Sequence, residues 1–203
     1  MRSYLASSEF IDWHHPDVSA KAAELAEGCL DKLQVAKHCF EFVRDEVRHS
    51  WDFQASQVTC RASDVLHHRT GYCYAKSHLL AALLRANGIP TGLCYQRLAV
   101  GEKGPPYCLH GINAAYFEDH GWYRLDARGN KPGVQTEFTP PSERLAFATS
   151  GDGEADLPEI WFEPLPCVVE TLLYCQTNKE VYENLPDIQL LMPTRKLSSD
   201  LQT

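Results

Sequence analysis

Apolar residues recur at helical spacing in the first ninety positions. Between residues 31 and 50 they recur at steps of three and four: Leu33, Ala36, Phe40, Val43 and Val47. This spacing predicts an amphipathic helix with one face in the core and the other charged. A preceding helix is expected to begin at Asp17, which would cap it, and to end at Gly28.

Two further helices are expected on either side of Gly71. A short helix over ASDVLHHRTG, residues 62–71, would end at Gly71. The main helix would run from about Cys73 to Asn87 with a broad apolar face, and Gly88 and Pro90 would stop it. The helical part of the chain therefore ends near residue 90.

Beyond Pro90 the apolar pattern changes to strand-like alternation. The stretches TGLCYQRLAV, LHGINAAYF and WYRLDA predict three strands, and the turn EDHG joins the last two. Helices first and an antiparallel sheet second indicate an α+β fold, in which the N-terminal helices pack on the sheet.

The length and composition suit one hydrophobic core. At 203 residues and 44% hydrophobic content, the chain predicts a single domain, 1–203, with a central part at about 62–130. Residues 129–166 are rich in Pro and Gly and contain the acidic patch GDGEAD, so a long surface excursion is expected there. Residues 167–185 predict a C-terminal helix that docks on the core.

Cys73 is the one cysteine of eight whose context suggests chemistry, because it follows Gly71 at the start of the main helix. A thiol attacks as the thiolate, which a helix N-terminus and a nearby imidazolium stabilise. The free amides of the first helical turn could also hold an oxyanion. A buried cysteine that merely starts a core helix would give the same pattern, so the interpretation depends on partners for Cys73.

His110 and Asp126 are the candidate partners. If three residues (118–120) or five close the hairpin, they become diagonal neighbours on one face, with Cβ atoms within about 7 to 8 Å. A two- or four-residue loop would place them on opposite faces. His110 would then take the proton of Cys73 and Asp126 would hold the imidazole. Alternatively, His110 is a strand-edge histidine, and Asp126 caps local amides of the turn-like DARGN.

Two segments, SDVLHHRTGYCYAKSHLLAALLRANGIPTG and LHGINAAYFEDHGWYRLDA, resemble the core of the transglutaminase-like superfamily of cysteine enzymes. That family has a nucleophilic Cys after a Gly, on a helix that runs into GIP, then a His opening one strand and an Asp ending the next. Cys73, His110 and Asp126 match in order and spacing, over about residues 62–130. The resemblance implies a papain-like, transglutaminase-core fold and, as in bacterial chains described as cysteine proteases, a catalytic triad.

Some positions depart from the common family pattern. Many members have an Arg at the position of Gly92, a Trp at that of Ile112, and Pro-Thr directly after the Asp, where this chain has Ala127 and Arg128. The triad survives these differences, whereas substrate preference could change with them. The family also has a side chain upstream of the Cys that helps the oxyanion, for which Gln54 and Trp51 are candidates.

The expected chemistry is attack of Cys73 on an amide or peptide carbonyl to form a thioester. Water would complete hydrolysis, as in a cysteine protease or amidase, whereas an amine would complete the reaction of a transglutaminase or other acyltransferase. We expect hydrolysis, with residues 129–166 as a lid or specificity wall. A non-catalytic binding module would be expected to lack one triad residue type, and a redox sensor would need a second thiol near Cys73, such as Cys94 or Cys108.

Charge and composition limit the binding partners that the protein is expected to have. The net charge of −8 argues against nucleic acid or an anionic membrane surface as a partner. Without a signal peptide pattern or about 18 consecutive apolar residues, a cytoplasmic protein is expected. Histidine pairs at 14–15 and 67–68, and Cys108 near His110, suggest zinc, but no C-x-x-C pair accompanies them. We therefore expect neither a metal nor a cofactor, and no sequence signal predicts an oligomeric state.

Overall fold

The computed structural model describes residues 1–101 and 104–190. The helices are η1 (Arg2–Leu5), α1 (Pro16–Ala26), α2 (Lys32–Glu46), α3 (Ala62–His68), α4 (Cys73–Ala86), α5 (Pro166–Tyr174) and α6 (Asn178–Glu183). The strands are β1 (Arg48–His49), β2 (Thr70–Gly71), β3 (Thr91–Ala99), β4 (Tyr107–Phe117), β5 (Gly121–Leu125), β6 (Glu137–Thr139), β7 (Ser142–Arg144) and β8 (Ala155–Asp156). The expected α+β order of helices followed by an antiparallel sheet is confirmed.

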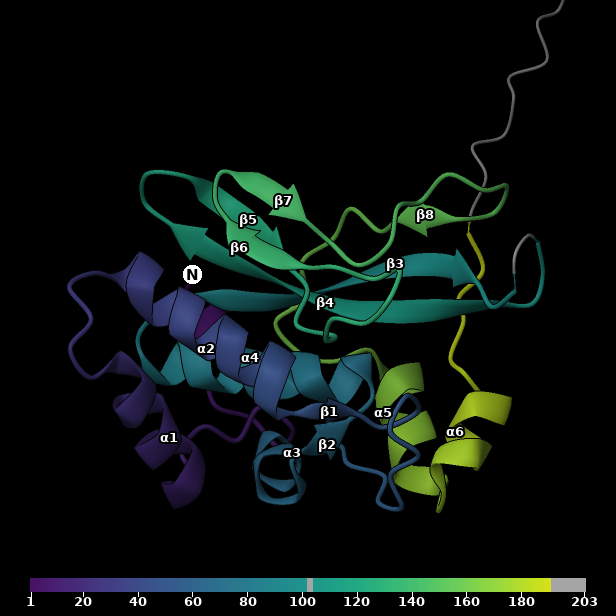
Figure 1. Ribbon diagram of the computed structural model, residues 1–203, viewed down its shortest axis with the longest axis horizontal. Helices are drawn as coiled ribbons and strands as arrows, with labels where there is room; N and C mark the ends of the chain where they lie inside the picture. The colour runs from purple at the N-terminus through teal and green to yellow at the C-terminus, as the bar shows by residue number, and fades with distance from the viewer. Residues whose placement is uncertain (102–103, 191–203) are drawn as a thin grey trace, which may run out of the picture.

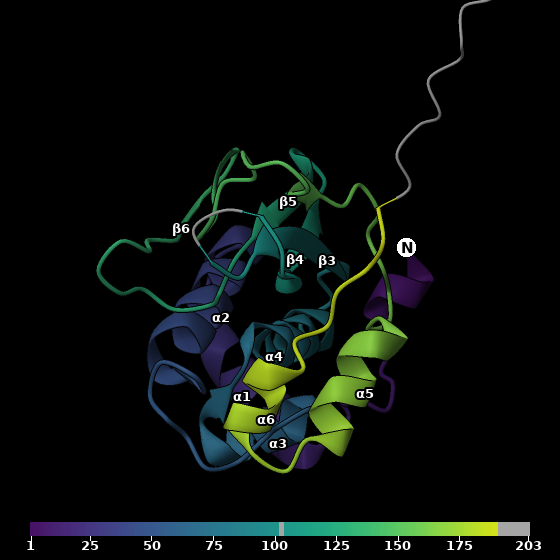
Figure 2. The ribbon, with the colours of Figure 1, turned by 90° about the vertical axis from the view of Figure 1, so that its right-hand side faces the viewer.

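The main sheet has four strands in the order β5-β4-β3-β8, and each neighbouring pair is antiparallel. Two small sheets join β1 to β2 in parallel and β6 to β7 in antiparallel fashion. Helix α4 packs on one face of the main sheet, α1, α2 and α3 lie around α4 on that side, and α5 and α6 lie at one end of this helical layer (Figures 1 and 2). Within the described residues, no helix combines the length and apolar character needed to cross a membrane.

Helix α4 is the centre of the core. Every residue from Cys73 to Arg85 is buried, because α1, α2 and α3 surround the helix and β3 and β4 cover its remaining side. The predicted broad apolar face is therefore only part of what is buried. Arg85 shows how a charge is accommodated there: its guanidinium donates to the carbonyls of Ala6, Thr91 and Phe162.

The hairpin between β4 and β5 has the three-residue loop that brings His110 and Asp126 to one face. Phe117 pairs with Gly121 and Tyr116 with Trp122, so residues 118–120 close the turn. Gly121 adopts a φ of +70°, a conformation that favours glycine. The register condition stated for His110 and Asp126 is therefore confirmed.

Two helix boundaries differ from the prediction. Helix α1 is capped by His15, whose side chain accepts a hydrogen bond from the N–H of Asp17, and not by Asp17 itself. Pro16 stands at the first helical position, where its missing N–H costs no hydrogen bond. Helix α3 ends at His68 and not at Gly71, because Arg69 turns the chain with a φ of +52° and Gly71 enters strand β2.

The single C-terminal helix predicted over 167–185 is wrong, since the structure has two helices there, α5 and α6. The chain extends at Cys175, and Thr177 then caps α6 by accepting a hydrogen bond from the N–H of Glu180. The Glu180 carboxylate accepts in return from the N–H of Gln176. This reciprocal capping starts a new helix and outweighs the helical periodicity that runs through the segment. As expected, α5 docks on the core through Val168 and Leu172.

The excursion over 129–166 returns to the sheet at two places. Strand β8 pairs with β3, and Trp161 forms a bridge with Leu93 through two backbone hydrogen bonds of 2.7 and 2.9 Å. Gly92 makes the second contact possible, because a Cβ there would lie 2.2 Å from the Ile160 side chain. The glycine that departs from the family pattern therefore lets the excursion approach β3 closely.

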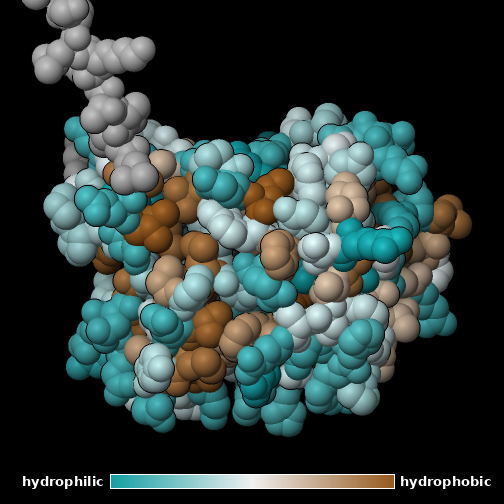
Figure 3. All heavy atoms as spheres, turned by 180° about the vertical axis from the view of Figure 1, so that it is seen from behind, coloured by the Kyte–Doolittle hydropathy of each residue, from teal (hydrophilic) through white to brown (hydrophobic). Residues whose placement is uncertain are grey.

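Large apolar side chains also remain on the surface. On α5, Leu173 and Tyr174 are exposed, and Phe162 is half exposed just before this helix. The view from behind shows more apolar surface on the half of the molecule where α5 lies (Figure 3).

Candidate active site

Cys73 occupies the first position of α4, directly beside strand β4. Its Sγ accepts a hydrogen bond from the N–H of Gly111 at 3.4 Å, and the residue is 7% exposed. Gly111 permits this contact, because a Cβ there would lie 3.0 Å from the Cα of Tyr74. Gly71 similarly allows β2 to approach α4, where a Cβ would lie 3.1 Å from Ala75. The two glycines place the thiol at the junction of helix and sheet.

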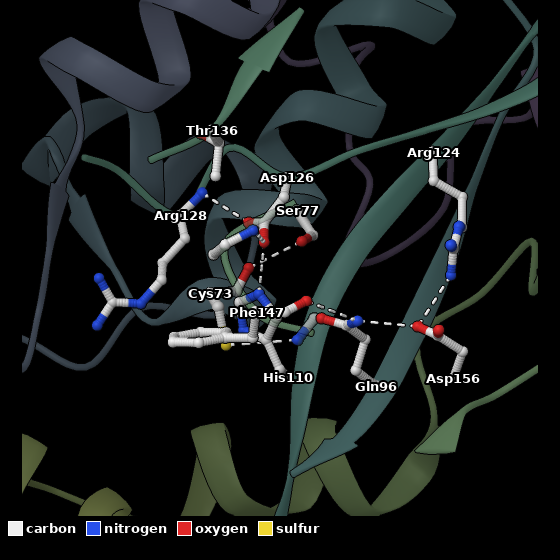
Figure 4. A network of polar contacts seen from close by, with 12 residues as sticks. Cys73, Ser77, Gln96, His110, Arg124, Asp126, Arg128, Thr136, Phe147 and Asp156 are labelled. Atoms are coloured by element: carbon white, nitrogen blue, oxygen red, sulfur yellow. Dashed lines mark hydrogen bonds and ion pairs between the residues drawn. The ribbon is translucent and has the colours of Figure 1, made fainter. Parts of the chain in front are cut away.

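His110 and Asp126 form a buried pair next to Cys73. The His110 Nε2–H donates to Asp126 Oδ2 at 2.8 Å, and Asp126 is fully buried at the end of β5 (Figure 4). Because Nε2 serves Asp126, Nδ1 is the ring nitrogen left to exchange a proton with the thiol. The structure thus brings all three predicted residues together.

The charges of this group support one another. Burial disfavours a charged His110, but the Asp126 carboxylate and the Cys73 sulfur favour it by charge and hydrogen bonding, and together they raise the pKa of His110 to about 10. Burial also works against an ionised Asp126, yet the charge and hydrogen bond of His110 lower the pKa of this carboxyl. An imidazolium–carboxylate pair is therefore stable at neutral pH.

Asp126 has two backbone partners as well. Its Oδ1 accepts from the N–H of Arg128 at 3.0 Å, and its Oδ2 accepts from the N–H of Ala146 at 3.0 Å. The interpretation that Asp126 caps local amides is therefore also correct, and the two roles coexist on one carboxylate. These bonds fix the carboxylate in the orientation that serves His110.

The excursion contributes Phe147 to the site, a residue that no sequence motif singled out. The Phe147 ring lies edge-on to the His110 imidazole, with 5.0 Å between centroids. Its carbonyl accepts from Gln96 Nε2, which also donates to Asp156, and Asp156 in turn pairs with Arg124 (Figure 4). This network ties the excursion to β3 and β5. Its only sequence signal was the position of Phe147 in a Pro- and Gly-rich segment.

A cleft of about 530 Å³ opens onto Cys73 and His110. Trp51 lines it and stacks on Tyr182 of α6, with ring centroids 4.0 Å apart. Gln54 is not among the lining residues; it is exposed and donates to the carbonyl of Trp51. Of the two oxyanion candidates, the structure therefore places only Trp51 in the cleft. His49, not considered from the sequence, also lines it.

The other thiols have a different environment. Burial raises the pKa of Cys39, Cys60, Cys94 and Cys108 to about 12 in each case. All eight cysteines lie within the described residues and are free thiols. Over residues 1–101 and 104–190, no group of three or more His, Cys, Asp or Glu side chains is arranged to hold a metal ion.

The comparisons agree with this geometry. The family model of the transglutaminase-like superfamily matches residues 19–127, more than half of the chain. The chain belongs to the transglutaminase-like superfamily. Membership assigns it to a group of enzymes with thiol-dependent acyl chemistry, and its α+β fold is that of the transglutaminase-like and papain-like proteins.

Solved structures that are similar to this chain have low sequence identity to it. A predicted cysteine protease from Cytophaga hutchinsonii is 20% identical with a TM-score of 0.50, over 62% of this chain and 40% of that chain. The periplasmic domain of TgpA from Pseudomonas aeruginosa is 21% identical with a TM-score of 0.48, over 62% of this chain and 46% of that one. The chain thus spans less than half the length of either protein. Among proteins with curated descriptions, none matches this sequence.

Proposed function

We propose that this superfamily member hydrolyses an amide or peptide bond with Cys73 as nucleophile, His110 as general base and acid, and Asp126 as the group that holds the imidazole. The observation that carries the proposal is the buried 2.8 Å hydrogen bond from His110 to Asp126, together with the position of His110 beside Cys73 in the wall of one cleft. A nucleophile, a base and an orienting carboxylate in contact are the arrangement that thiol catalysis needs.

In the first half of the proposed reaction, the site starts with the proton of the Cys73 thiol already on His110 Nδ1, because the raised pKa of His110 favours the imidazolium at neutral pH. The thiolate attacks the carbonyl carbon, and the N–H groups of the first turn of α4, which have no partner inside the helix, stabilise the oxyanion. His110 then protonates the leaving nitrogen as the C–N bond breaks. The products of this half are ammonia or an amine and a thioester on Cys73.

In the second half, His110 Nδ1 takes a proton from water, and the resulting hydroxide attacks the thioester carbonyl. The C–S bond breaks, the carboxylic acid leaves, and the proton stays on His110 beside the Cys73 thiolate. Throughout the cycle Asp126 stays ionised and keeps His110 Nε2 as the donor, which agrees with the direction of its pKa shift. An amine in place of water would give acyl transfer.

We also propose a reducing, cytoplasmic setting. The free state of all eight cysteines supports it, because four of them are only half buried, and such thiols persist where disulfides are reduced.

The first test is to map which cysteine reacts with iodoacetamide between pH 5 and 9, in the native protein and in His110→Ala. We expect Cys73 to be labelled at pH 6, and the His110→Ala protein to need a higher pH, because the imidazolium that pairs with the thiolate is gone. Cys94 and Cys108 are internal controls, since their raised pKa values keep them protonated. Equal labelling of Cys73 and these controls would contradict the proposal and favour a non-catalytic binding module.

The second test separates hydrolysis from acyl transfer. A peptide amide library is incubated with the protein in the presence and absence of an alkyl amine, and the products are resolved by mass spectrometry. Free acid as the main product in both conditions supports hydrolysis. A dominant amine adduct would instead identify a transferase that uses the same three residues.

A further inference from the structure

A second cleft, of about 510 Å³, adjoins the one that holds Cys73. It lies between the end of α2, strand β1 and residues 128–131. His49 and Arg128 line both clefts and so form their common wall. The Arg128 guanidinium is directed away from Cys73 and His110 (Figure 4). A ligand that occupies the first cleft could therefore extend into the second.

Basic side chains dominate the lining of this second cleft. Its basic residues are Arg44, Arg48, Lys76, Arg128 and Lys131, and its acidic residues are Asp45 and Asp52. The excess of positive charge is local, because the whole chain carries a net charge of −8. A concave site with one sign of charge attracts ligands of the opposite sign.

Not all of these cations are neutralised by the protein itself. Asp52 pairs with Arg128 and Lys131 at 2.7 Å each, and Asp45 pairs with Arg44. For Arg48 and Lys76, the part of the chain that the structure describes offers no carboxylate within salt-bridge distance. These two side chains are the cations available to a bound anion.

The excess of positive charge is most unfavourable at Lys76, because this residue is only 1% exposed and water cannot solvate its ammonium. Its ammonium donates to the carbonyl of Val47, and burial lowers its pKa to about 7. A buried cation that lacks a counter-ion is unfavourable, and an anion that enters the cleft would relieve that cost.

His49 gives a second, independent indication of a ligand. Its Nδ1 is buried and has no hydrogen-bond partner, since the nearest carboxylate oxygen, on Asp52, is 3.6 Å away. Burial, then the charge of Arg128, lowers the pKa of His49 well below its usual value, so the ring is neutral and can donate through one nitrogen. A buried polar atom in the wall of a cleft indicates a partner supplied from outside.

We infer that the second cleft binds an anionic group, a carboxylate or a phosphate, of the same amide substrate whose scissile bond lies at Cys73. Arg48, Lys76 and His49 would contact the anion, and Arg128 would separate it from the reacting carbonyl. The inference rests on the proposed function for its link to Cys73. It makes the substrate an acidic amide or peptide.

Binding is tested first, apart from any chemistry. The Cys73→Ala protein is titrated with glutarate and with inorganic phosphate by calorimetry at low ionic strength. We expect saturable binding that weakens roughly three- to tenfold in Arg48→Gln and tightens in Asp45→Asn, because these changes remove a cation and an anion from the lining. Lys179→Gln is the matched control, since Lys179 is an exposed lysine on α6 that does not line the cleft.

Two outcomes would overturn the inference. In the first, neither probe binds; in the second, a probe binds but Arg48→Gln and Lys76→Met leave its affinity unchanged. The two probes distinguish the sources of the anion, since preference for phosphate over glutarate would indicate a phosphorylated substrate.

The substrate link is tested by kinetics. Peptide amides that carry Glu, Gln or phosphoserine at successive positions around the scissile bond are compared in the wild-type protein and in Arg48→Gln. We expect one position at which Glu or phosphoserine raises kcat/KM over Gln, and a loss of this preference in the variant. If no peptide is cleaved, the proposed function fails while the calorimetry still decides the anion site. If peptides are cleaved without any acidic preference, the substrate class inferred here is wrong.

Discussion

The two clefts on either side of His49 and Arg128 differ in how their charged side chains are paired. In the first, the His110 imidazolium lines the wall and is bonded to the Asp126 carboxylate buried behind it, and aromatic rings line the cleft as well. In the second, several cations share fewer carboxylates, and Lys131 and Arg48 reach solvent. The first cleft is organised around a fixed internal pair and the second around charges that are only partly matched.

The two clefts differ in how strongly solvent screens their charges. An enclosed pair acts at low effective dielectric, so a single change there has a large effect on charge and chemistry. Pairs near the surface are screened by water and salt, so a change there is small. Variants in the two clefts should therefore differ in the size of their effects, and the expectations below run from the largest to the smallest.

Replacing the nucleophile should have the largest effect. We expect Cys73→Ala to lower kcat for amide hydrolysis by about 10⁵-fold or more, because the thiol beside His110 is removed. Steady-state kinetics on the cleaved peptide measure this, with Cys108→Ala as the control because Cys108 lines the same cleft. Residual activity close to that of the wild type would place the chemistry elsewhere in the molecule.

Asp126→Asn should lower kcat by about 10²- to 10⁴-fold, because the amide can no longer hold His110 as the carboxylate does. It should also shift the pH profile. Removal of the carboxylate lowers the pKa of His110 from about 10, so the alkaline limb of kcat/KM moves to lower pH. Rates measured between pH 6 and 11 test both effects.

The matched control for this variant is Asp119→Asn, which changes an exposed carboxyl in the β4–β5 turn. An alkaline limb that stays in place in Asp126→Asn would show that Asp126 does not act through the charge of His110.

Lys76→Met should stabilise the protein by roughly 1 to 3 kcal/mol below pH 7, since it removes a buried charge without a counter-ion. The sign follows from the lowered pKa of about 7 against 10.5 in the unfolded chain. Between pH 7 and 10.5 the unfolded chain binds more protons than the folded chain, so the destabilising effect of the charge is largest below pH 7, falls as pH rises through this window, and is absent above 10.5. Denaturant unfolding at pH 6 and pH 10 measures it, and an equal gain at both would contradict the explanation.

Phe147→Ala should have a moderate effect on both activity and structure. The ring packs edge-on against His110, and such aromatic contacts contribute about 0.5 to 1.5 kcal/mol. We expect a rise in KM and a smaller fall in kcat, because the imidazole loses a packing partner but keeps Asp126. Phe162→Ala is a suitable control, since Phe162 is exposed and does not line the cleft. A change in Phe162→Ala as large as that in Phe147→Ala would contradict the assignment.

Lys131→Gln should have the smallest effect. The Lys131 side chain is 41% exposed, so its ion pair with Asp52 contributes about 0.5 kcal/mol or less to the free energy of unfolding, and less still at high salt. Asp52→Asn is the sharper variant of the pair, because it leaves the mostly buried Arg128 unpaired as well. Equal losses in the two variants would show that the pair of Asp52 with Arg128 contributes nothing beyond the pair with Lys131.

Local signals in the sequence were sufficient where a residue's neighbours along the chain decide its structure. The apolar period predicted α2 and α4, and alternation predicted β3, β4 and β5. The turn EDHG set a loop whose length decides the register, so the approach of His110 to Asp126 could be stated as a condition in advance. The same kind of signal was present but unused at Thr177 and Glu180, whose capping separates α5 from α6.

The sequence by itself thus determined the α+β order, the position of Cys73 at a helix start and the three residues that meet. Only the tertiary structure decided that Phe147 lies on His110, that Trp51 and not Gln54 faces the cleft, and that Lys76 is buried without a counter-ion. The physical reason is distance along the chain. Helical and strand periods report contacts within a few residues, whereas these arrangements join segments far apart in the sequence, whose meeting depends on how the whole chain packs.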